Sequence, residues 1–203
     1  MTIQAHSLDQ RLYLDINHFA RSTSWLHPVA APFALWIGVV ILGAIIIAGW
    51  WVARRATDPL TAVSKAIWVG VACFISLGAN QIVAHLVKRI RPYYAMHGVE
   101  VLVAKAHDYT FPSDHAVVAG TVMAGMWLVA KRLAILATIV GLLLAFARVY
   151  VGAHYPSDVL GGLVLGAVIC LALAKPMIAI IKVFVRALSK TALRPLVQAK
   201  AST

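Results

Sequence analysis

The stretch APFALWIGVVILGAIIIAGWWV, residues 31–52, decides the fold class, because no charged side chain interrupts it. The longer interval between Arg21 and Arg54 also contains no Asp, Glu, Lys or Arg. About 20 apolar residues are enough for a helix to cross a bilayer. Trp50 and Trp51 stand next to Arg54, the aromatic and basic border typical of a membrane interface. We therefore expect residues 31–52 to form a transmembrane helix.

The composition extends this expectation to the whole chain of 203 residues. Hydrophobic residues make up 62% of it and charged residues 12%, and its mean hydropathy is +0.85. A soluble domain would carry about twice that charged fraction. Four more apolar segments follow, at about residues 66–87, 113–130, 133–147 and 158–174. The sequence thus predicts an all-α fold, a polytopic membrane helical bundle of about five transmembrane helices.

The two ends of the chain have a different pattern. Residues 7–19 place apolar side chains at helical spacing but interrupt them with Asp9, Arg11 and Asp15, which favours an amphipathic helix in the membrane interface. Residues 176–203 carry regularly spaced Lys and Arg and predict a basic cytoplasmic tail. We expect one integral membrane domain over residues 1–203, with its motifs within about residues 80–165.

The distribution of Lys and Arg predicts the orientation, because basic loops tend to stay cytoplasmic. Alternating spans place eleven of the 18 basic residues on one side and seven on the other. The eleven are Arg54, Arg55, Lys65, Lys131, Arg132, Lys175, Lys182, Arg186, Lys190, Arg194 and Lys200. That side is the expected cytoplasmic side. The net charge of +11 is then explained by the orientation of the spans and by the attraction of basic residues to anionic lipid headgroups. Nucleic acid is not an expected partner, since no basic recognition element accompanies the charge.

Three polar clusters lie at the opposite, extracytoplasmic ends of the predicted spans. They are KRIRP at residues 88–92, FPSDH at residues 111–115, and the segment from Arg148 to HYPSD at residues 154–158. Alternation of the spans brings all three to one membrane face. His85, inside the second span, is either a functional ionisable group or a neutral histidine bonded between helices.

These clusters contain the groups that phosphoryl transfer needs. Guanidinium groups suit phosphate oxygens, and a helix that begins at FPSDH offers backbone N–H groups to an anion. Of the two histidines, one imidazole can attack phosphorus while the other protonates the departing oxygen. Asp158, four residues after His154, is placed to accept a hydrogen bond from that ring and fix its tautomer. The candidate residues are His154, His115 and Asp158 as catalytic groups, and Arg91, Arg148, Ser113, Asp114 and Lys88 as phosphate-binding groups, with no metal or other cofactor.

The same residues resemble the type 2 phosphatidic acid phosphatase superfamily, whose motifs are Lys-x6-Arg-Pro, Pro-Ser-x-His and Ser-Arg-x5-His-x3-Asp. Here Arg91-Pro92 matches the end of the first motif, residues 112–115 match the second, and Arg148, His154 and Asp158 match the third. The FPSDHA form and the short chain look like the bacterial undecaprenyl pyrophosphate phosphatases of this superfamily.

The resemblance assigns roles to these residues. It implies that His154 is the nucleophile and forms a phosphohistidine, that Asp158 orients it, and that His115 is the general acid. It also implies that Arg91, Ser113 and Arg148 hold the phosphate without a metal. Bacterial enzymes of this kind recycle the lipid carrier of cell-wall synthesis.

Two positions depart from the family motifs. The motif lysine falls at Ala84 and the motif serine at Ala147. Lys88 lies one turn beyond Ala84, so we expect its ammonium group to replace the missing lysine. Nothing obvious in the sequence replaces the serine hydroxyl.

The predicted function is hydrolysis of a polyprenyl pyrophosphate to the monophosphate, at the extracytoplasmic face of the cell membrane. Phosphatidic acid and phosphatidylglycerophosphate are alternative substrates. A non-catalytic binder or transporter of anionic lipid is a second alternative, suggested by Ala84 and Ala147. A serine hydrolase using Ser113 is the third, although no Gly-x-Ser-x-Gly elbow is present.

Overall fold

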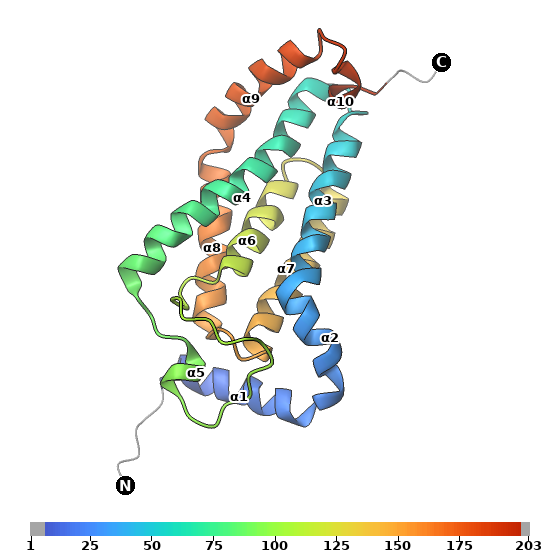
Figure 1. Cartoon of the computed structure of the whole chain (residues 1–203). Coiled ribbons are helices and arrows are strands. Elements are labelled where there is room, and N and C mark those ends of the chain that lie inside the picture. The colour runs from blue at the N-terminus through green and yellow to red at the C-terminus, as the bar shows by residue number, and fades with distance from the viewer. Residues whose placement is uncertain (1–6, 200–203) are drawn as a thin grey trace.

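The computed structural model describes residues 7–199, and these residues form helices and connecting loops only (Figure 1). The elements in chain order are α1 (Leu8–Ser22), a 3-10 turn η1 (Ser24–Leu26), α2 (His27–Pro32), a π-helical turn η2 (Phe33–Ile37), α3 (Gly38–Ala53), α4 (Pro59–Val87), α5 (Pro92–Ala95), α6 (Asp114–Met126), α7 (Lys131–Tyr150), α8 (Pro156–Ala172), α9 (Ala174–Leu188) and α10 (Arg194–Val197). The expected all-α bundle is confirmed. Residues 1–6 of the expected domain and residues 200–203 of the expected tail lie outside the described residues.

The apolar helices correspond to the predicted spans. Three helical stretches are long and apolar enough to cross a membrane: Ser24–Ala53, Pro59–Ala95 and Lys131–Tyr150. Helices α8 and α9 form a fourth if their 57° bend is counted within one span. The expected third span is α6, which has 13 residues. At 1.5 Å per residue it is only about 20 Å long.

Helix α6 occupies the centre of the bundle rather than its lipid-facing edge. It lies among α3, α4, α7 and α8 (Figure 1) and buries Val117, Val122 and Met126 completely. Its contact with α8 is close enough to require small residues. A Cβ added at Gly166 would lie 2.1 Å from the carbonyl oxygen of Val117, so only glycine allows the two backbones to approach this closely. This packing sets the first turns of α6 and α8 side by side.

Helix α1 crosses the end of the bundle where α6 and α8 begin (Figure 1). It starts with a capping box, in which the Ser7 hydroxyl accepts from the Gln10 N–H and the Gln10 side chain accepts from the Ser7 N–H. One face buries Tyr13 and Asn17, whereas Leu8 on the other face is exposed. This is the amphipathic interface helix expected from the sequence.

The opposite end of the bundle carries α9 and α10. Helix α9 turns away from α8 and packs along α4, with Lys182 contacting Thr61 and Asp58 near the start of α4. The basic tail predicted from the sequence therefore lies at the end of the bundle that is remote from the three motifs.

Candidate functional site

His154 lies in the short turn between α7 and α8 and is 2% exposed. Gly152 in this turn has a φ of +79°, a left-handed conformation that side chains disfavour. A Cβ at Gly152 would also lie 2.3 Å from the carbonyl oxygen of Glu100. Pro156 then begins α8 at its first helical position. The turn thus packs His154 between two helix ends and the long loop of residues 96–113.

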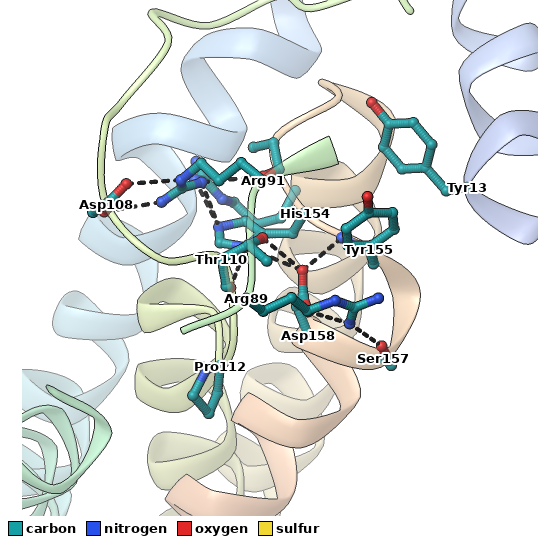
Figure 2. Close-up of polar contacts among 12 residues, drawn as sticks. Tyr13, Arg89, Arg91, Asp108, Thr110, Pro112, His154, Tyr155, Ser157 and Asp158 are labelled. Atoms are coloured by element: carbon teal, nitrogen blue, oxygen red, sulfur yellow. Dashed lines mark hydrogen bonds and ion pairs between the residues drawn. The ribbon is translucent and has the colours of Figure 1, made fainter. Parts of the chain in front are cut away.

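The imidazole ring of His154 has a defined tautomer. Its Nδ1 atom lies 2.9 Å from the backbone carbonyl oxygen of Thr110, which can only accept, so Nδ1 carries the proton and donates it. The lone pair is therefore on Nε2, which lies 3.4 Å from Arg91 Nη1 (Figure 2). The same nitrogen lies 3.3 Å from Arg148 Nη2. An unprotonated nitrogen between two guanidinium groups is placed to attack a phosphorus atom whose oxygens those groups hold.

The electrostatics of the site favour this neutral ring. Burial, together with the positive charges of Arg148 and Arg91, lowers the pKa of His154 to about 4, although Asp158 acts in the opposite direction. The ring is consequently unprotonated near pH 7, which is the state that a nucleophile requires.

Asp158, in the first turn of α8, is fully buried, and its Oδ2 atom lies 3.8 Å from Nδ1 of His154. That distance exceeds a hydrogen bond. Oδ2 instead accepts from the Thr110 hydroxyl at 2.6 Å and from the Tyr155 N–H at 2.8 Å (Figure 2). The Thr110 hydroxyl is also 3.1 Å from Nδ1 of His154. Asp158 and His154 are therefore connected through Thr110, in place of the direct hydrogen bond expected from the sequence.

The two arginines reach the site from different helices. Arg91, just before α5, and Arg148, in the last turn of α7, are both buried. Arg91 donates to both oxygens of Asp108, from Nε at 2.7 Å and from Nη2 at 3.0 Å (Figure 2). Arg148 donates from Nη1 to the carbonyl oxygen of Ala34, a residue of η2, at 3.2 Å. In each arginine, part of the guanidinium group is bound to protein oxygens, while other N–H donors remain near His154.

A cavity of about 690 Å³ unites most of the predicted residues. Its lining includes His154, His115, Arg91, Arg148 and Asp114. His115, in the first turn of α6, donates from Nε2 to the carbonyl oxygen of Leu35 at 3.1 Å. The two histidines thus share one cavity, and His115 is anchored to η2.

Ser113 and Asp114 differ in how well they suit an anion. Ser113 precedes α6, and its buried hydroxyl has no hydrogen-bond partner among the described residues, but Ser113 is not among the residues that line the cavity. Asp114 accepts from Asn80 at 2.6 Å and from Gln81 at 3.2 Å. These bonds anchor α4 to α6, and a carboxylate repels phosphate. The contacts of Asp114 therefore favour a structural role over the phosphate contact expected from the sequence.

Lys88 lies outside the cavity. It ends α4 in a left-handed conformation with a φ of 52°, is exposed, and is not among the residues that line the cavity. Ala84 does line it, and so does His85, whose Nδ1 donates to the carbonyl oxygen of Gln81 at 2.7 Å. The expected substitution of Lys88 for the missing lysine is therefore not reflected in the geometry. Helix α4 ends at Val87, and Lys88 is its left-handed cap residue.

Thr110 and Asp108 were not singled out as site residues by the sequence, and Arg89 was considered there only as one of the cations of the cluster at residues 88–92. Thr110 and Asp108 lie in a polar loop without a motif, and only the folded loop brings them to His154 and Arg91. Arg89 belongs to the basic cluster KRIRP, but the structure uses it in an ion pair with Asp158 rather than in the cavity lining. Within residues 7–199, no group of three His, Cys, Asp or Glu side chains is arranged to hold a metal ion.

Known proteins share both the sequence pattern and the fold. The chain is 35% identical over 103 residues to "Undecaprenyl-diphosphatase BcrC" of Bacillus subtilis, which covers 51% of this chain and 53% of that protein. It is 33% identical over 168 residues to "Putative undecaprenyl-diphosphatase YbjG" of Escherichia coli, covering 81% of this chain and 80% of that one. The chain thus spans only about half the length of the Bacillus relative.

A solved structure supports the architecture. The crystal structure of Aquifex aeolicus LpxE superposes with a TM-score of 0.64 at 21% identity, covering 86% of this chain and 99% of that one. This likeness concerns the fold. A family model described as the PAP2 superfamily matches residues 65–180, which contain all three motifs. The chain therefore belongs to the PAP2 superfamily.

Proposed function

We propose that this protein is a membrane lipid phosphatase that hydrolyses a polyprenyl diphosphate, of the undecaprenyl type, to the monophosphate. The observation that carries the proposal is the unprotonated Nε2 of His154 between the guanidinium groups of Arg91 and Arg148. The names of the BcrC and YbjG relatives support the choice of substrate.

The proposed reaction has two displacements. Nε2 of His154 attacks the terminal phosphorus, and the bond from phosphorus to the bridging oxygen breaks. The lipid monophosphate leaves with a proton from the imidazolium form of His115, which becomes neutral. A water molecule then gives a proton to His115 and attacks the phosphohistidine, which releases inorganic phosphate and frees Nε2. Arg91, Arg148 and the Ser113 hydroxyl hold the phosphoryl oxygens throughout.

A substrate panel tests this proposal. The purified protein in detergent is assayed for phosphate release from undecaprenyl diphosphate, undecaprenyl phosphate, phosphatidic acid and phosphatidylglycerophosphate, with His154→Gln as the blank. We expect the diphosphate to have the highest kcat/KM. Faster release from a glycerophospholipid would reassign the substrate class, and no release from any lipid would favour a non-catalytic binder.

The covalent intermediate has its own test. Rapid acid-free quenching of a reaction with a substrate labelled at the terminal phosphorus should trap label on the wild-type protein, in a bond that resists alkali and breaks in acid. His154→Gln should trap none. A label that survives acid would instead indicate an oxygen ester and support a serine nucleophile such as Ser113.

We further propose that the site faces the extracytoplasmic side, because the motifs lie at the end of the bundle with fewer basic residues. Two single-cysteine variants in a cysteine-free background show which side of the membrane each position faces. One is His97→Cys in the long loop, and the other is Lys131→Cys at the start of α7. An impermeant maleimide applied to intact cells should label position 97 and spare position 131. The reverse pattern would invert the topology.

A further inference from the structure

The amino-terminal helix reaches the back of the candidate site through Asp9. One oxygen of Asp9 accepts from the backbone N–H of Ser157 at 2.9 Å, and the other accepts from the Ser157 hydroxyl at 2.6 Å. Ser157 is in the first turn of α8, where N–H groups lack partners within the helix. Asp9 thus caps α8 from a different helix, and a carboxylate at this position is also favoured by the helix dipole.

Arg89 connects this cap to Asp158. Its Nη1 atom donates to Asp158 Oδ1 at 2.7 Å and to the Ser157 hydroxyl at 2.6 Å (Figure 2), and its Nη2 atom pairs with Asp9. The guanidinium group also lies 4.0 Å above the ring of Tyr155. One planar fork therefore bridges two carboxylates from α1 and α8, a geometry that lysine cannot reproduce.

The partners of Asp158 explain why this bridge matters. A fully buried carboxylate is costly unless it is paired and hydrogen-bonded. Thr110 and the Tyr155 N–H occupy Oδ2, the oxygen nearest His154, and Arg89 occupies Oδ1. Arg89 therefore compensates the charge of Asp158 from the side away from the imidazole. Oδ2 remains the oxygen nearest the imidazole, 3.8 Å from Nδ1, where its negative charge stabilises the positive charge that develops on the ring as Nε2 attacks phosphorus.

We propose that Arg89 and Asp9 are positioning residues that hold Asp158 against His154, so that the seating of helix α1 at the end of the bundle sets the rate of turnover. Neither residue contacts the cavity that receives substrate. This inference rests on the proposed phosphatase function.

The pairing predicts how variants affect the reaction. Arg89→Gln should lower kcat by more than about tenfold, because it leaves a buried carboxylate without its cationic partner, while KM changes less than about twofold. Asp9→Asn should lower kcat by only about threefold, since Arg89 remains on Asp158. Arg89→Lys should recover part of the loss. Residues that act as one unit are non-additive, so Asp9→Asn in the Arg89→Gln background should add little.

Asp15→Asn is the matched control, because it makes the same change of charge on the exposed side of the same helix. It should leave kcat and KM unchanged. The kinetics are measured on the full-length protein in detergent with the best substrate of the panel. If Arg89→Gln does not purify as a monodisperse protein, Arg89→Lys and Asp9→Asn decide the question.

The outcomes separate this inference from the proposed function. A wild-type protein without phosphatase activity would contradict the proposed function. If the wild type is active, any of three results would overturn the positioning role. The first is an unchanged kcat in Asp9→Asn and Arg89→Lys, and the second is a loss that appears only in KM. The third is fully additive effects in the double variant.

Discussion

The carbonyl oxygen of Thr110 lies 2.9 Å from Nδ1 of His154, and the hydroxyl of the same threonine lies 2.6 Å from Oδ2 of Asp158. The first contact fixes the tautomer of the imidazole, and the second satisfies the buried carboxylate. A single loop residue thus connects the proposed nucleophile with the acid that is expected to orient it.

Thr110→Val should separate these two contributions. It preserves the backbone carbonyl and the shape of the side chain but removes the hydroxyl from Asp158, leaving a buried acceptor with one bond fewer. We expect kcat to fall roughly tenfold, equivalent to about 1.4 kcal/mol, with little change in KM. Thr110→Ser keeps the hydroxyl and should retain most of the activity. Equal losses in both variants would show that the methyl group, rather than the hydroxyl, is required.

The second prediction concerns the protonation of His154. Because burial and the two arginines lower its pKa to about 4, the ring should stay neutral well below pH 6 in the folded protein. Imidazole nitrogen NMR of the labelled, substrate-free protein should show Nδ1 protonated and Nε2 unprotonated at pH 5, with His154→Gln providing the assignment. Titration of this ring near its unperturbed pKa of about 6.5 would contradict the buried, neutral state.

The same shift predicts a pH dependence of stability. The unfolded chain takes up a proton on this histidine below about pH 6.5, whereas the folded protein takes it up only near pH 4. The stabilising contribution is therefore complete above about pH 6.5 and is lost as the pH falls toward 4. The wild-type protein should lose more thermal stability between pH 7 and pH 4.5 than His154→Gln, measured in one detergent and buffer series. Parallel losses would argue against a depressed pKa.

The third prediction uses the leaving group to test His115. A diphosphate releases a phosphate ester that needs little protonation, whereas a lipid monophosphate releases an alkoxide that needs a proton. We expect His115→Ala to lower kcat about 100-fold on monophosphate lipids and less than tenfold on the diphosphate. His97→Ala, on the long loop outside the cavity lining, is the control. Equal losses on both substrates would remove His115 from the general-acid role.

Much of this arrangement could be predicted because it follows from local patterns. The apolar segments predicted where the helices lie, since a bilayer imposes length and hydropathy, although α4 begins at Pro59 rather than near residue 66. Alternation of spans then brought Arg91, Arg148, His115 and His154 to one end, where they line one cavity. The bend after α8 and the central position of α6 depend on how the helices pack against one another. The spacing of apolar residues in the sequence does not predict that packing.

The site details that escaped prediction are those that depend on a loop or on a helix end. Nothing in the sequence marks Thr110, because its role comes from how residues 96–113 fold over the turn that carries His154. Extrapolating α4 beyond residue 87 placed Lys88 on the face of Ala84. The chain takes a left-handed conformation there, and Lys88 is exposed and does not line the cavity.

The fourth prediction concerns Asp108, which binds two donors of Arg91. Its side chain is 58% exposed, so the bridge is exchangeable and also reduces the positive charge available to phosphate. Asp108→Asn should therefore lower the inhibition constant of inorganic phosphate by about two- to fivefold. Asp15→Asn changes the net charge equally and should not alter inhibition. Weaker inhibition in Asp108→Asn would mean that the carboxylate mainly orients Arg91.

The last prediction concerns the wall of the cavity formed by α4. Ala84 lines the cavity at the position of the family lysine, whereas Lys88 is exposed beyond the end of the helix. A lysine at position 84 would add a cation directly to this wall. We expect Ala84→Lys to lower KM for a lipid monophosphate about tenfold, in the range of a charge-assisted hydrogen bond. Lys88→Ala should change kcat/KM for monophosphate and diphosphate by less than about twofold, as for an exposed charge.

Ala84→Met is the matched control for Ala84→Lys, because it fills similar space without a charge. Equal KM values for the Met and Lys variants would show that volume, not charge, determines binding at this wall. A selective loss of diphosphate hydrolysis in Lys88→Ala would instead show that the lysine reaches the second phosphate from outside the cavity. Because Lys88 ends α4 with a positive φ, Lys88→Gly provides a further comparison that relieves the backbone strain while it removes the charge. Loss of activity in both the Ala and the Gly variant would then be attributable to the lysine side chain and not to the backbone strain.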